Sequence, residues 1–600
     1  MRVVLFVLKC AVGLLASVGL LVVLLAVGAG LAWQHLRDAG PAQPEVPERA
    51  VLTVDLTNGL ASGGQPSPLD RVTGTPPLPQ RTALRAIRRA ATDSQIKALA
   101  VRGGRAPLSM AQAQAVREAV ARFRESGKPA VFFAETLGTG AGGTIQAYLS
   151  SGFGEVWLQP SGTYALGGFR VASPFFKEAL DELGVEPRFA QRKAYKGFAD
   201  RFTREKMAEK QKANLRQLVD GLMGQVARGV AGGRPISSAR VRELSGQAPL
   251  NAERAVAEEL VDELGYQHGV LRHAREQAGD GAELVGARAY AGARLDTETD
   301  EGEIAVIDAS GPVQPGASDQ GPLQRGAVLG ADTVRGAVTA ALEAEHIEAI
   351  VLRVNSPGGS YVASDTVWNA VKRAADADKP IVVSMGDIAA SGGYFLAAPA
   401  NHIAAQPGTL TGSIGVAGGK FVVDGLLAKL GVGVDGVQSG ERADYMSPTS
   451  DFSEAEWARF QDSLDTIYAD FTGKVARGRG LGPAATEKAA QGRIFTGKRA
   501  QALGLVDSLG GFHHAVRVAK RKAGMPERRQ VVLQPFPERE PALKRLIERA
   551  LQGHLAAARA ARLAEATARL APVMRALGML DGAGRLHAGP GAAALARPSR

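Results

Sequence analysis

The stretch EAIVLRVNSPGGSY at residues 348–361 joins a strand-like apolar run to a glycine-rich turn. Residues 362–375 then follow a helical pattern, and KPIVVSM at 379–385 is strand-like again. This order is typical of a parallel sheet, because parallel neighbours need a crossover connection that is usually a helix. GEIAVID at 302–308 is strand-like as well and extends the unit toward the N-terminus. The second half of the chain is therefore predicted to be an α/β domain.

The first half repeats this order. AVLTVDL at 50–56, KALAV at 97–101 and KPAVFFAE at 128–135 are strand-like, and QAVREAVARFRES at 114–126 has a helical pattern. We therefore expect the two halves to share one architecture.

Direct comparison of the halves gives a single register. WLQPSG at 157–162 matches AAQPGT at 404–409, and ELGVEPRFAQ at 182–191 matches KLGVGVDGVQ at 429–438. Both pairs are 247 positions apart, as expected for a tandem duplication.

Domain boundaries follow from this register. We predict α/β repeats at 48–298 and 302–525, separated by the acidic, Thr-rich segment LDTETDEGE around Thr297. A chain of 600 residues exceeds what one core usually serves, which agrees with two domains.

Cysteine and histidine limit the possible chemistry. Cys10 is the only cysteine, so neither a disulfide framework nor a cysteine-based metal cluster can form within one chain. The nine histidines show no H-E-x-x-H or comparable spacing. We predict no metal and no organic cofactor.

The N-terminus carries an uncharged apolar run from Ala11 to Trp33, long enough to cross a bilayer as a helix. Arg2 and Lys9 precede it and favour a cytoplasmic N-terminus. We predict a membrane anchor at residues 1–33, with the rest of the chain outside the cytoplasm. A signal peptide cleaved before Gly30 is the alternative.

Residues 526–600 are rich in alanine and arginine, and we expect them to be helical or partly disordered. They contain 13 Lys and Arg against 6 Asp and Glu, and so carry +7 of the chain's formal +11. Attachment to an anionic lipid surface and packing on an oligomeric neighbour both remain open. Nucleic-acid binding is disfavoured, because no recognised module accompanies the charge.

SMGDIAASGGYFLAAPAN at 384–401 places Ser391 between small residues, directly before two glycines. In such a strand-to-helix junction a serine hydroxyl can project as a nucleophile, and the following N–H of Gly392 can stabilise an oxyanion. Gly359 of NSPGGS is a second candidate donor, because glycine lets the backbone approach a substrate closely. An ordinary helix N-cap serine is the simpler interpretation of A-S-G-G taken alone.

Several motifs together point to a known family. NSPGGS, SMGDIAASGGY, PAN, TLTGSIG at 409–415 and GRIFTGKRAQALGLVDSLG at 492–510 resemble signal peptide peptidase A, also called protease IV, over roughly residues 1–525. The resemblance implies two crotonase-like α/β domains related to the Clp protease fold. It also implies a Ser/Lys dyad without a cofactor, with Ser391 as nucleophile, Lys196 of AYKGF as general base and Ser413 holding the lysine amine.

The same resemblance implies a biological setting. Such enzymes are membrane-bound homo-oligomers, here expected to be tetramers. They act at the outer side of the bacterial inner membrane, where they degrade residual signal peptides and other apolar peptides. An apolar groove near the site is expected. Whether Ser391 meets Lys196 of its own chain or of a neighbour is open.

The internal register offers an independent check on the dyad. Thr144 lies 247 positions before Ser391, and Ala443 lies 247 positions after Lys196. Each half therefore lacks one member of a dyad, which favours one composite site. A lysine base must also be largely unprotonated, so burial has to lower its pKa from ~10.4 toward ~7–8.

Other assignments compete with this one. Lys193 is the nearest alternative base, and His402 with Asp387 would suggest a Ser/His/Asp triad, which we consider less favoured. Asp387 also departs from the family motif, which often has a small residue there. A crotonase-type acyl-thioester enzyme and a non-catalytic membrane scaffold are the alternative functions.

Overall fold

A computed structural model gives the fold of the chain. It describes residues 46–61, 77–104, 106–138, 140–294, 303–318, 327–526 and 529–537. The predicted anchor at 1–33, the centre of the predicted linker and most of the predicted tail lie outside the described residues. No helix within the described ranges is long and apolar enough to cross a membrane.

The first half forms a parallel six-stranded sheet. Its strands, in spatial order, are β10 (Glu263–Leu264), β6 (Glu155–Leu158), β5 (Ala130–Ala134), β4 (Ile96–Arg102), β1 (Ala50–Asp55) and β11 (Glu283–Gly286). One face packs against α3 (Gln80–Thr92) and α4 (Met110–Glu125), and the other against α11 (Gln267–Ala278). The strands and helix predicted from the sequence pattern are confirmed here.

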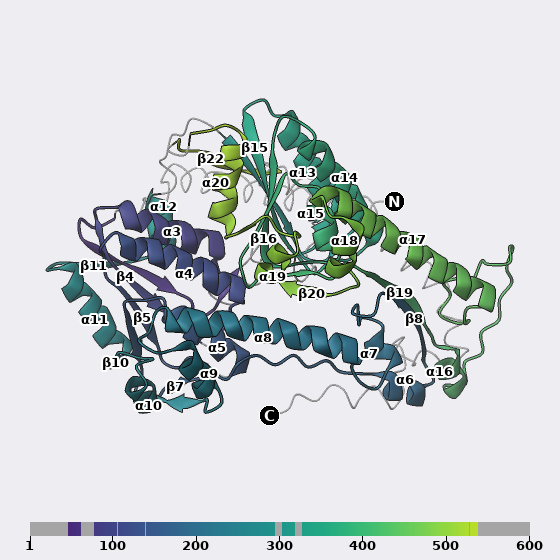
Figure 1. Ribbon diagram of the computed structural model, residues 1–600, viewed down its shortest axis with the longest axis horizontal. Helices are drawn as coiled ribbons and strands as arrows, with labels where there is room; N and C mark the ends of the chain where they lie inside the picture. Colours follow the sequence, from purple (N-terminus) through teal and green to yellow (C-terminus); the bar gives the residue numbers. More distant parts are fainter. Residues whose placement is uncertain are drawn as a thin grey trace, which may run out of the picture. The chain divides into compact units, whose positions relative to one another are not determined.

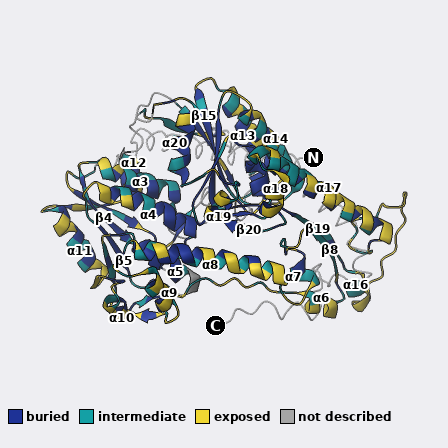
Figure 2. Ribbon diagram, in the orientation of Figure 1, coloured by how far each residue is buried: buried dark blue, intermediate teal, exposed yellow. Residues whose placement is uncertain are grey.

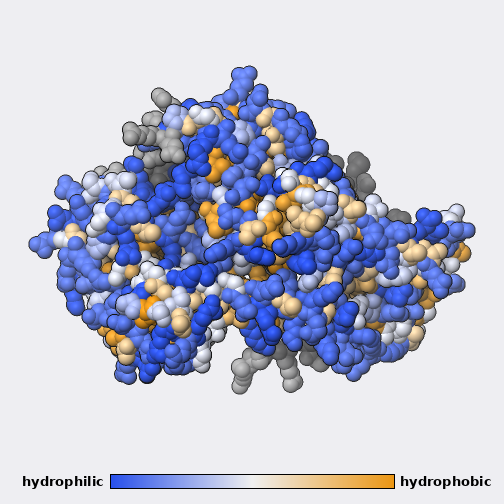
Figure 3. Space-filling view, viewed as in Figure 1, coloured by the Kyte–Doolittle hydropathy of each residue, from blue (hydrophilic) through white to orange (hydrophobic). Residues whose placement is uncertain are grey.

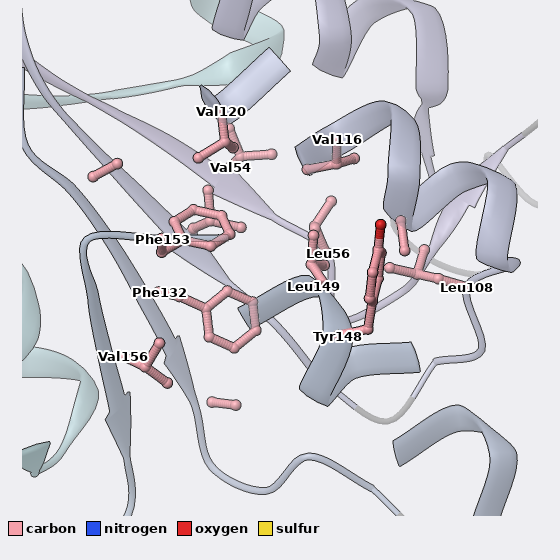
Figure 4. Close-up of a cluster of buried hydrophobic side chains, with 14 of the residues drawn as sticks. Val54, Leu56, Leu108, Val116, Val120, Phe132, Tyr148, Leu149, Phe153 and Val156 are labelled. Atoms are coloured by element: carbon pink, nitrogen blue, oxygen red, sulfur yellow. The ribbon is translucent and has the colours of Figure 1, made fainter. Parts of the chain in front are cut away.

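The larger core of this half lies under α4 and α5 (Gly140–Ser150). Figure 4 shows Phe132 of β5 close to Phe153, and their ring centroids are 5.2 Å apart. Both side chains are fully buried, and each such residue contributes about 1.5–3 kcal/mol to folding.

The second half forms a sheet whose main path has the same order. Its parallel strands are β21 (Ser508–Leu509), β17 (His402–Ala405), β16 (Ile381–Ala390), β15 (Ile347–Ser356), β12 (Glu303–Ser310) and β22 (Val532–Phe536). At its carboxyl end β16 pairs in parallel with β18 (Leu410–Gly412), which in turn pairs with the antiparallel strand β20 (Ile494–Thr496). The predicted parallel α/β unit is thus confirmed.

Helices cover both faces of this sheet. α13 (Ala331–Glu343) and α14 (Tyr361–Ala375) bury one face, and α20 (Phe512–Lys522) buries the other. Figure 2 shows the central strands buried and the outer sides of the helices exposed. Most of the apolar positions predicted to be strands therefore serve as core.

The remaining elements are short or connect the halves. The helices are α6 (Lys177–Leu183), α7 (Asp200–Thr203), α8 (Glu209–Ala231), α9 (Ser238–Ser245), α10 (Ala252–Ala257), α12 (Ala287–Arg294), α15 (Gly392–Ala397), α16 (Asp424–Lys429), α17 (Glu454–Arg479), α18 (Pro483–Ala489) and α19 (Gly497–Ala502). The strands are β2 (Leu60–Ala61), β3 (Leu78–Pro79), β7 (Thr163–Tyr164), β8 (Glu186–Arg192), β9 (Leu250–Asn251), β13 (Val313–Gln314), β14 (Leu329–Gly330) and β19 (Val416–Val422).

The two halves are joined by a two-stranded ribbon. β8 of the first half pairs antiparallel with β19 of the second over seven residue pairs, from Arg192–Val416 to Glu186–Val422 (Figure 1). Phe189, Phe202 and Phe421 pack together on one side of the ribbon, with ring centroids 4.9–5.3 Å apart. The ribbon carries first-half residues into the second half.

One predicted boundary is wrong. We expected a helical or partly disordered tail from residue 526, but Val532–Phe536 forms β22 and pairs in parallel with β12. This strand was missed because QVVLQPF is short and contains a proline, which is tolerated where no ladder partner needs its N–H, as on an edge strand.

Candidate active site

The loop that carries Ser391 has a strained backbone. Ser391 follows β16 and precedes α15 with φ 54° and ψ −121°, a conformation that costs a non-glycine residue about 1–3 kcal/mol. Its N–H donates to the Gly412 carbonyl at 2.9 Å, which holds the turn in place. The hydroxyl makes no capping bond to α15. The simple N-cap interpretation is therefore wrong, and the geometry is that of a nucleophile elbow.

Glycines surround this elbow because side chains would not fit. A Cβ on Gly358 would lie 2.8 Å from Ser391 Cβ, and a Cβ on Gly392 would lie 3.1 Å from the Gly359 nitrogen. The Gly359 and Gly392 nitrogens thus converge beside the serine. Gly392 opens α15, so its N–H has no acceptor within the helix. The two predicted oxyanion donors are brought together.

Lys196 enters the site from the first half, four residues beyond the end of β8. Its Nζ lies 2.9 Å from Ser391 Oγ, 2.9 Å from the Ser413 carbonyl oxygen and 3.1 Å from Ser413 Oγ. All five predicted site residues therefore lie at one place within a single chain.

Burial sets the charge state of Lys196. Desolvation lowers the pKa of its amine to about 7, because the enclosed site disfavours the ammonium form. Its three close partners are hydroxyl and carbonyl oxygens, which orient the amine without adding a negative charge. An amine with this pKa is about half neutral at physiological pH and can accept a proton.

Contacts with the second half hold the segment around Lys196 in place. The Arg192 guanidinium, at the end of β8, binds the Asp465 carboxylate of α17 at 2.6 Å and the Gln461 carbonyl at 3.1 Å. Glycine is required opposite Lys196, because a Cβ on Gly492 would come within 2.6 Å of its backbone nitrogen. These contacts fix where the amine points.

The competing side chains have other partners. His402 Nε2 lies 2.7 Å from Ser508 Oγ, and Asp387 accepts a hydrogen bond from Ser109 Oγ of the first half. The exposed Lys193 places its Nζ over the Tyr468 ring, 5.4 Å from the centroid. Ser391 is instead bonded to Lys196, so the geometry does not assemble the Ser/His/Asp alternative.

Thr144 and Ala443, the repeat equivalents of Ser391 and Lys196, have different surroundings. Thr144 lies inside α5, where its Oγ1 accepts from the Gly168 N–H at 2.8 Å and donates to the Gly168 carbonyl at 3.1 Å. Ala443 lies in an exposed turn. The first-half hydroxyl is therefore occupied, and no amine is available at the second-half position.

Sequence reasoning missed the residues that support the nucleophile strand. Asn355 Oδ1 accepts from the N–H groups of Asp387 and Ile388 at 3.0 and 3.1 Å, where β15 and β16 lose their regular register. Ser109 reaches the same bulge from the N-cap of α4. Asn355 is the first residue of NSPGGS and so had a local signal, whereas Ser109 is 278 residues from its partner and had none.

An elbow serine bonded to a buried lysine amine of lowered pKa, with two glycine nitrogens close beside it, is the arrangement of a serine hydrolase. Comparison with known proteins agrees with this class. The sequence model of the protein family described as peptidase family S49 matches residues 122–280, which include Lys196, and residues 373–526, which include Ser391 and Ser413. The chain belongs to peptidase family S49, as its motifs predicted.

Three relatives illustrate the match. Protease 4 of Salmonella typhi is 35% identical over 423 residues, covering 69% of this chain and 66% of the relative. The chloroplastic serine protease SPPA of Arabidopsis thaliana is 29% identical, with coverage of 70% and 62%. Protease 4 of Haemophilus influenzae is 29% identical, with coverage of 70% and 68%. The chain thus spans about two thirds of the length of these relatives.

Proposed function

We propose that this chain is a serine endopeptidase in which Ser391 is the nucleophile and Lys196 the general base. The observation that carries the proposal is the 2.9 Å separation of Lys196 Nζ and Ser391 Oγ, with burial lowering the lysine pKa to about 7. Ser413 orients the amine through its hydroxyl and carbonyl oxygens.

The proposed reaction is acyl transfer in two steps. Ser391 Oγ attacks the peptide carbonyl carbon while Lys196 takes the hydroxyl proton, and the N–H groups of Gly359 and Gly392 stabilise the oxyanion. Lys196 then gives the proton to the leaving amine as the C–N bond breaks. Water attacks the resulting ester with Lys196 as base, and the proton returns to Ser391.

The proposed substrates are residual signal peptides and other apolar peptides. A groove of about 440 Å³ lies between α8 and β20, with Leu218, Ile494 and Phe495 among its apolar lining residues. Apolar residues gather in the middle of the face in Figure 3, near β20 and α19. Because β20 pairs with β18, which leads to Ser413, this groove is a reasonable approach for an apolar chain.

We further propose that residues 1–33 anchor the protein in the bacterial inner membrane as a single span with a cytoplasmic N-terminus. The two α/β repeats then lie on the outer side. The uncharged run between Ala11 and Trp33 supports this placement. The enzyme is proposed to act as a homo-oligomer, a tetramer by resemblance to its family.

A direct test compares three variants with the wild type in hydrolysis of an apolar peptide and in labelling by a fluorophosphonate probe. Ser391→Ala should abolish both, and Lys196→Ala should do nearly the same. Lys193→Ala should leave both intact, because its side chain is exposed and lies over Tyr468. Hydrolysis that survives without Ser391 would remove it from the mechanism.

A further inference from the structure

Three consecutive residues, Gln491, Gly492 and Arg493, lie against both the turn that carries the base and the serine that orients its amine. The Gln491 carbonyl accepts from the N–H of Tyr195, one residue before the base, at 3.2 Å. The Arg493 carbonyl accepts from the Ser413 N–H at 2.6 Å. These residues begin the stretch that ends in IFTGKRAQALGLVDSLG, a motif that takes no part in the proposed reaction. They therefore connect the two sides of the pocket that holds the amine.

The backbone of this segment is held in an uncommon conformation. Gln491 has φ 64° and Gly492 has φ 82°, both in the left-handed region. The Gln491 N–H donates to the Tyr468 hydroxyl of α17 at 3.2 Å, and the Gly492 N–H donates to the Ile414 carbonyl at 2.7 Å. Ser413 is also left-handed, with φ 52°. Non-glycine residues keep this conformation where their surroundings enforce it, so the segment and Ser413 stabilise each other.

The Arg493 side chain covers the residue that precedes the base. Its guanidinium carbon lies 4.2 Å from the centroid of the Tyr195 ring, within the range of a cation–π contact. Its Nη1 donates to the Glu487 and Lys488 carbonyls of α18 at 3.3 and 3.2 Å. A cation is favourable there, because the last carbonyls of a helix have no partner within it. The guanidinium is thus held between the end of α18 and the Tyr195 ring.

Arginine suits this position better than lysine. A planar guanidinium can stack on a ring with its face and donate hydrogen bonds from its edge, whereas an ammonium is a point charge on a flexible stem. Arg493 and Tyr195 are both half-buried, and cation–π contacts are stronger where water is partly excluded. Loss of either side chain would leave the turn that carries Lys196 with fewer contacts to the second half.

We propose that Arg493 is a positioning residue that acts through the Tyr195 ring to hold the Lys196 amine in reach of the nucleophile. This inference rests on the proposed role of Lys196 and adds the side chains that set its geometry. An amine that moves away from Ser391 Oγ is also more open to water, which favours the ammonium form. Loss of Arg493 should therefore change both the rate and its pH dependence.

A double-mutant cycle in peptide hydrolysis by the full chain tests this coupling. Arg493→Ala and Tyr195→Ala should each lower kcat about 10–100-fold with KM changed less than about threefold, because a displaced amine affects the chemical step. The double variant should be no slower than the slower single variant, since both side chains act through one contact. Effects that multiply, or a loss confined to KM, would overturn the proposal.

The pH dependence of fluorophosphonate labelling gives a second readout, which a purely structural role would not move. In both alanine variants the midpoint should lie at higher pH than in the wild type, because a solvated amine is protonated more readily. Tyr195→Phe keeps the ring and should keep the wild-type rate and midpoint. Arg493→Lys should restore only part of the rate, because an ammonium cannot stack and donate in the same way.

Lys488→Ala is the matched control, since it removes an exposed positive charge from the same end of α18 and should leave the rate and the midpoint unchanged. Arg493→Gln serves if the alanine variant does not fold, because glutamine keeps a donor for the α18 carbonyls without the stacked cation. Thermal unfolding is measured for each variant.

Two failures can be told apart. A wild type without a midpoint near the lysine pKa of about 7 would overturn the proposed function and this inference with it. A wild type with that midpoint, but with the same rate and midpoint in folded Arg493→Ala or Arg493→Gln, would overturn this inference alone. An equal shift in Lys488→Ala would also overturn it, because the effect would then come from charge and not from the contact with Tyr195.

Discussion

Ser391 and Thr144 occupy equivalent positions in two sheets of the same strand order, yet their hydroxyls are presented differently. Ser391 stands at an elbow before α15 with a positive φ, and its hydroxyl meets an amine. Thr144 lies within α5, which begins four residues earlier, and its hydroxyl is bonded to the Gly168 backbone. The difference shows that the strained elbow, more than the sheet beneath it, exposes a nucleophile.

The lysine positions differ in a related way. Lys196 follows a paired strand and is enclosed by the second half, whereas Ala443 follows an unpaired, exposed segment. The contact between the two halves within one chain therefore provides the burial that lowers the pKa of an amine. The proposed site needs one contribution from each repeat.

The largest expected effect on kcat comes from removing the Ser391 hydroxyl, and removing the equivalent hydroxyl of Thr144 provides the contrast. Ser391→Ala should lower kcat by at least about 10⁴-fold, since nucleophile and base act as a unit. Thr144→Ala should leave kcat unchanged but cost about 0.5–1.5 kcal/mol of stability, because the part-buried Gly168 N–H loses its acceptor. Peptide hydrolysis and urea unfolding of both variants measure this contrast, and a large loss of kcat in Thr144→Ala would contradict it.

Removing the base should have the next largest effect. Lys196→Met keeps much of the side-chain volume but removes the amine, so kcat should fall by about 10²–10⁴-fold. Lys193→Met serves as a matched control three residues away and should keep full activity. The ratio of the two rates on one peptide is the measurement, and similar losses would mean that the lysine assignment is wrong.

Crowding the predicted oxyanion donors should cost somewhat less. Gly392→Ala places a Cβ 2.4 Å from Ser364 Oγ and 3.1 Å from the Gly359 nitrogen, so the two N–H groups must move apart. Loss of one well-placed donor usually lowers kcat by about 10²–10³-fold. Ala398, outside the elbow, can be changed to Gly as a control, and kcat is the quantity to compare. Unchanged kcat in Gly392→Ala would remove this nitrogen from the site.

A smaller effect is expected at the contact between the first half and the nucleophile strand. Ser109→Ala removes the hydroxyl bonded to Asp387, four residues before Ser391, and should lower kcat about 10-fold with little change in KM. Ser237→Ala is a matched control, since Ser237 also caps a first-half helix but lies away from this strand. Both variants lose about 1 kcal/mol of cap energy. Equal kcat in the two would leave Ser109 with a purely structural role.

Much of this site was predictable from the sequence because its signals are local. The glycine motifs marked Ser391, Gly359 and Gly392 as candidates, and the 247-residue register placed Thr144 and Ala443 at the positions equivalent to Ser391 and Lys196. The alternation of apolar strands and amphipathic helices also predicted the parallel sheets. What the sequence did not reveal depends on contacts between distant segments.

Three features illustrate that limit. β8 crosses to the second half and pairs with β19, which places Lys196 beside Ser391. Yet β8 is only half-buried and shows no strong apolar periodicity. β22 joins the sheet by pairing with a strand more than 200 residues earlier. The bond between Ser109 and Asp387 depends on how α4 packs against β16. Each arises from packing between elements, which periodicity along the chain does not encode.

The central claim is that Lys196 is neutral when it accepts the Ser391 proton, and the pH dependence of inactivation tests it most directly. The rate of fluorophosphonate labelling at Ser391 should fall tenfold per pH unit in acid, because the protonated amine cannot accept a proton. It should level off above a midpoint near the lysine pKa of about 7. A rate that keeps rising to a midpoint near ~10.4, the pKa of an exposed lysine, would contradict the account.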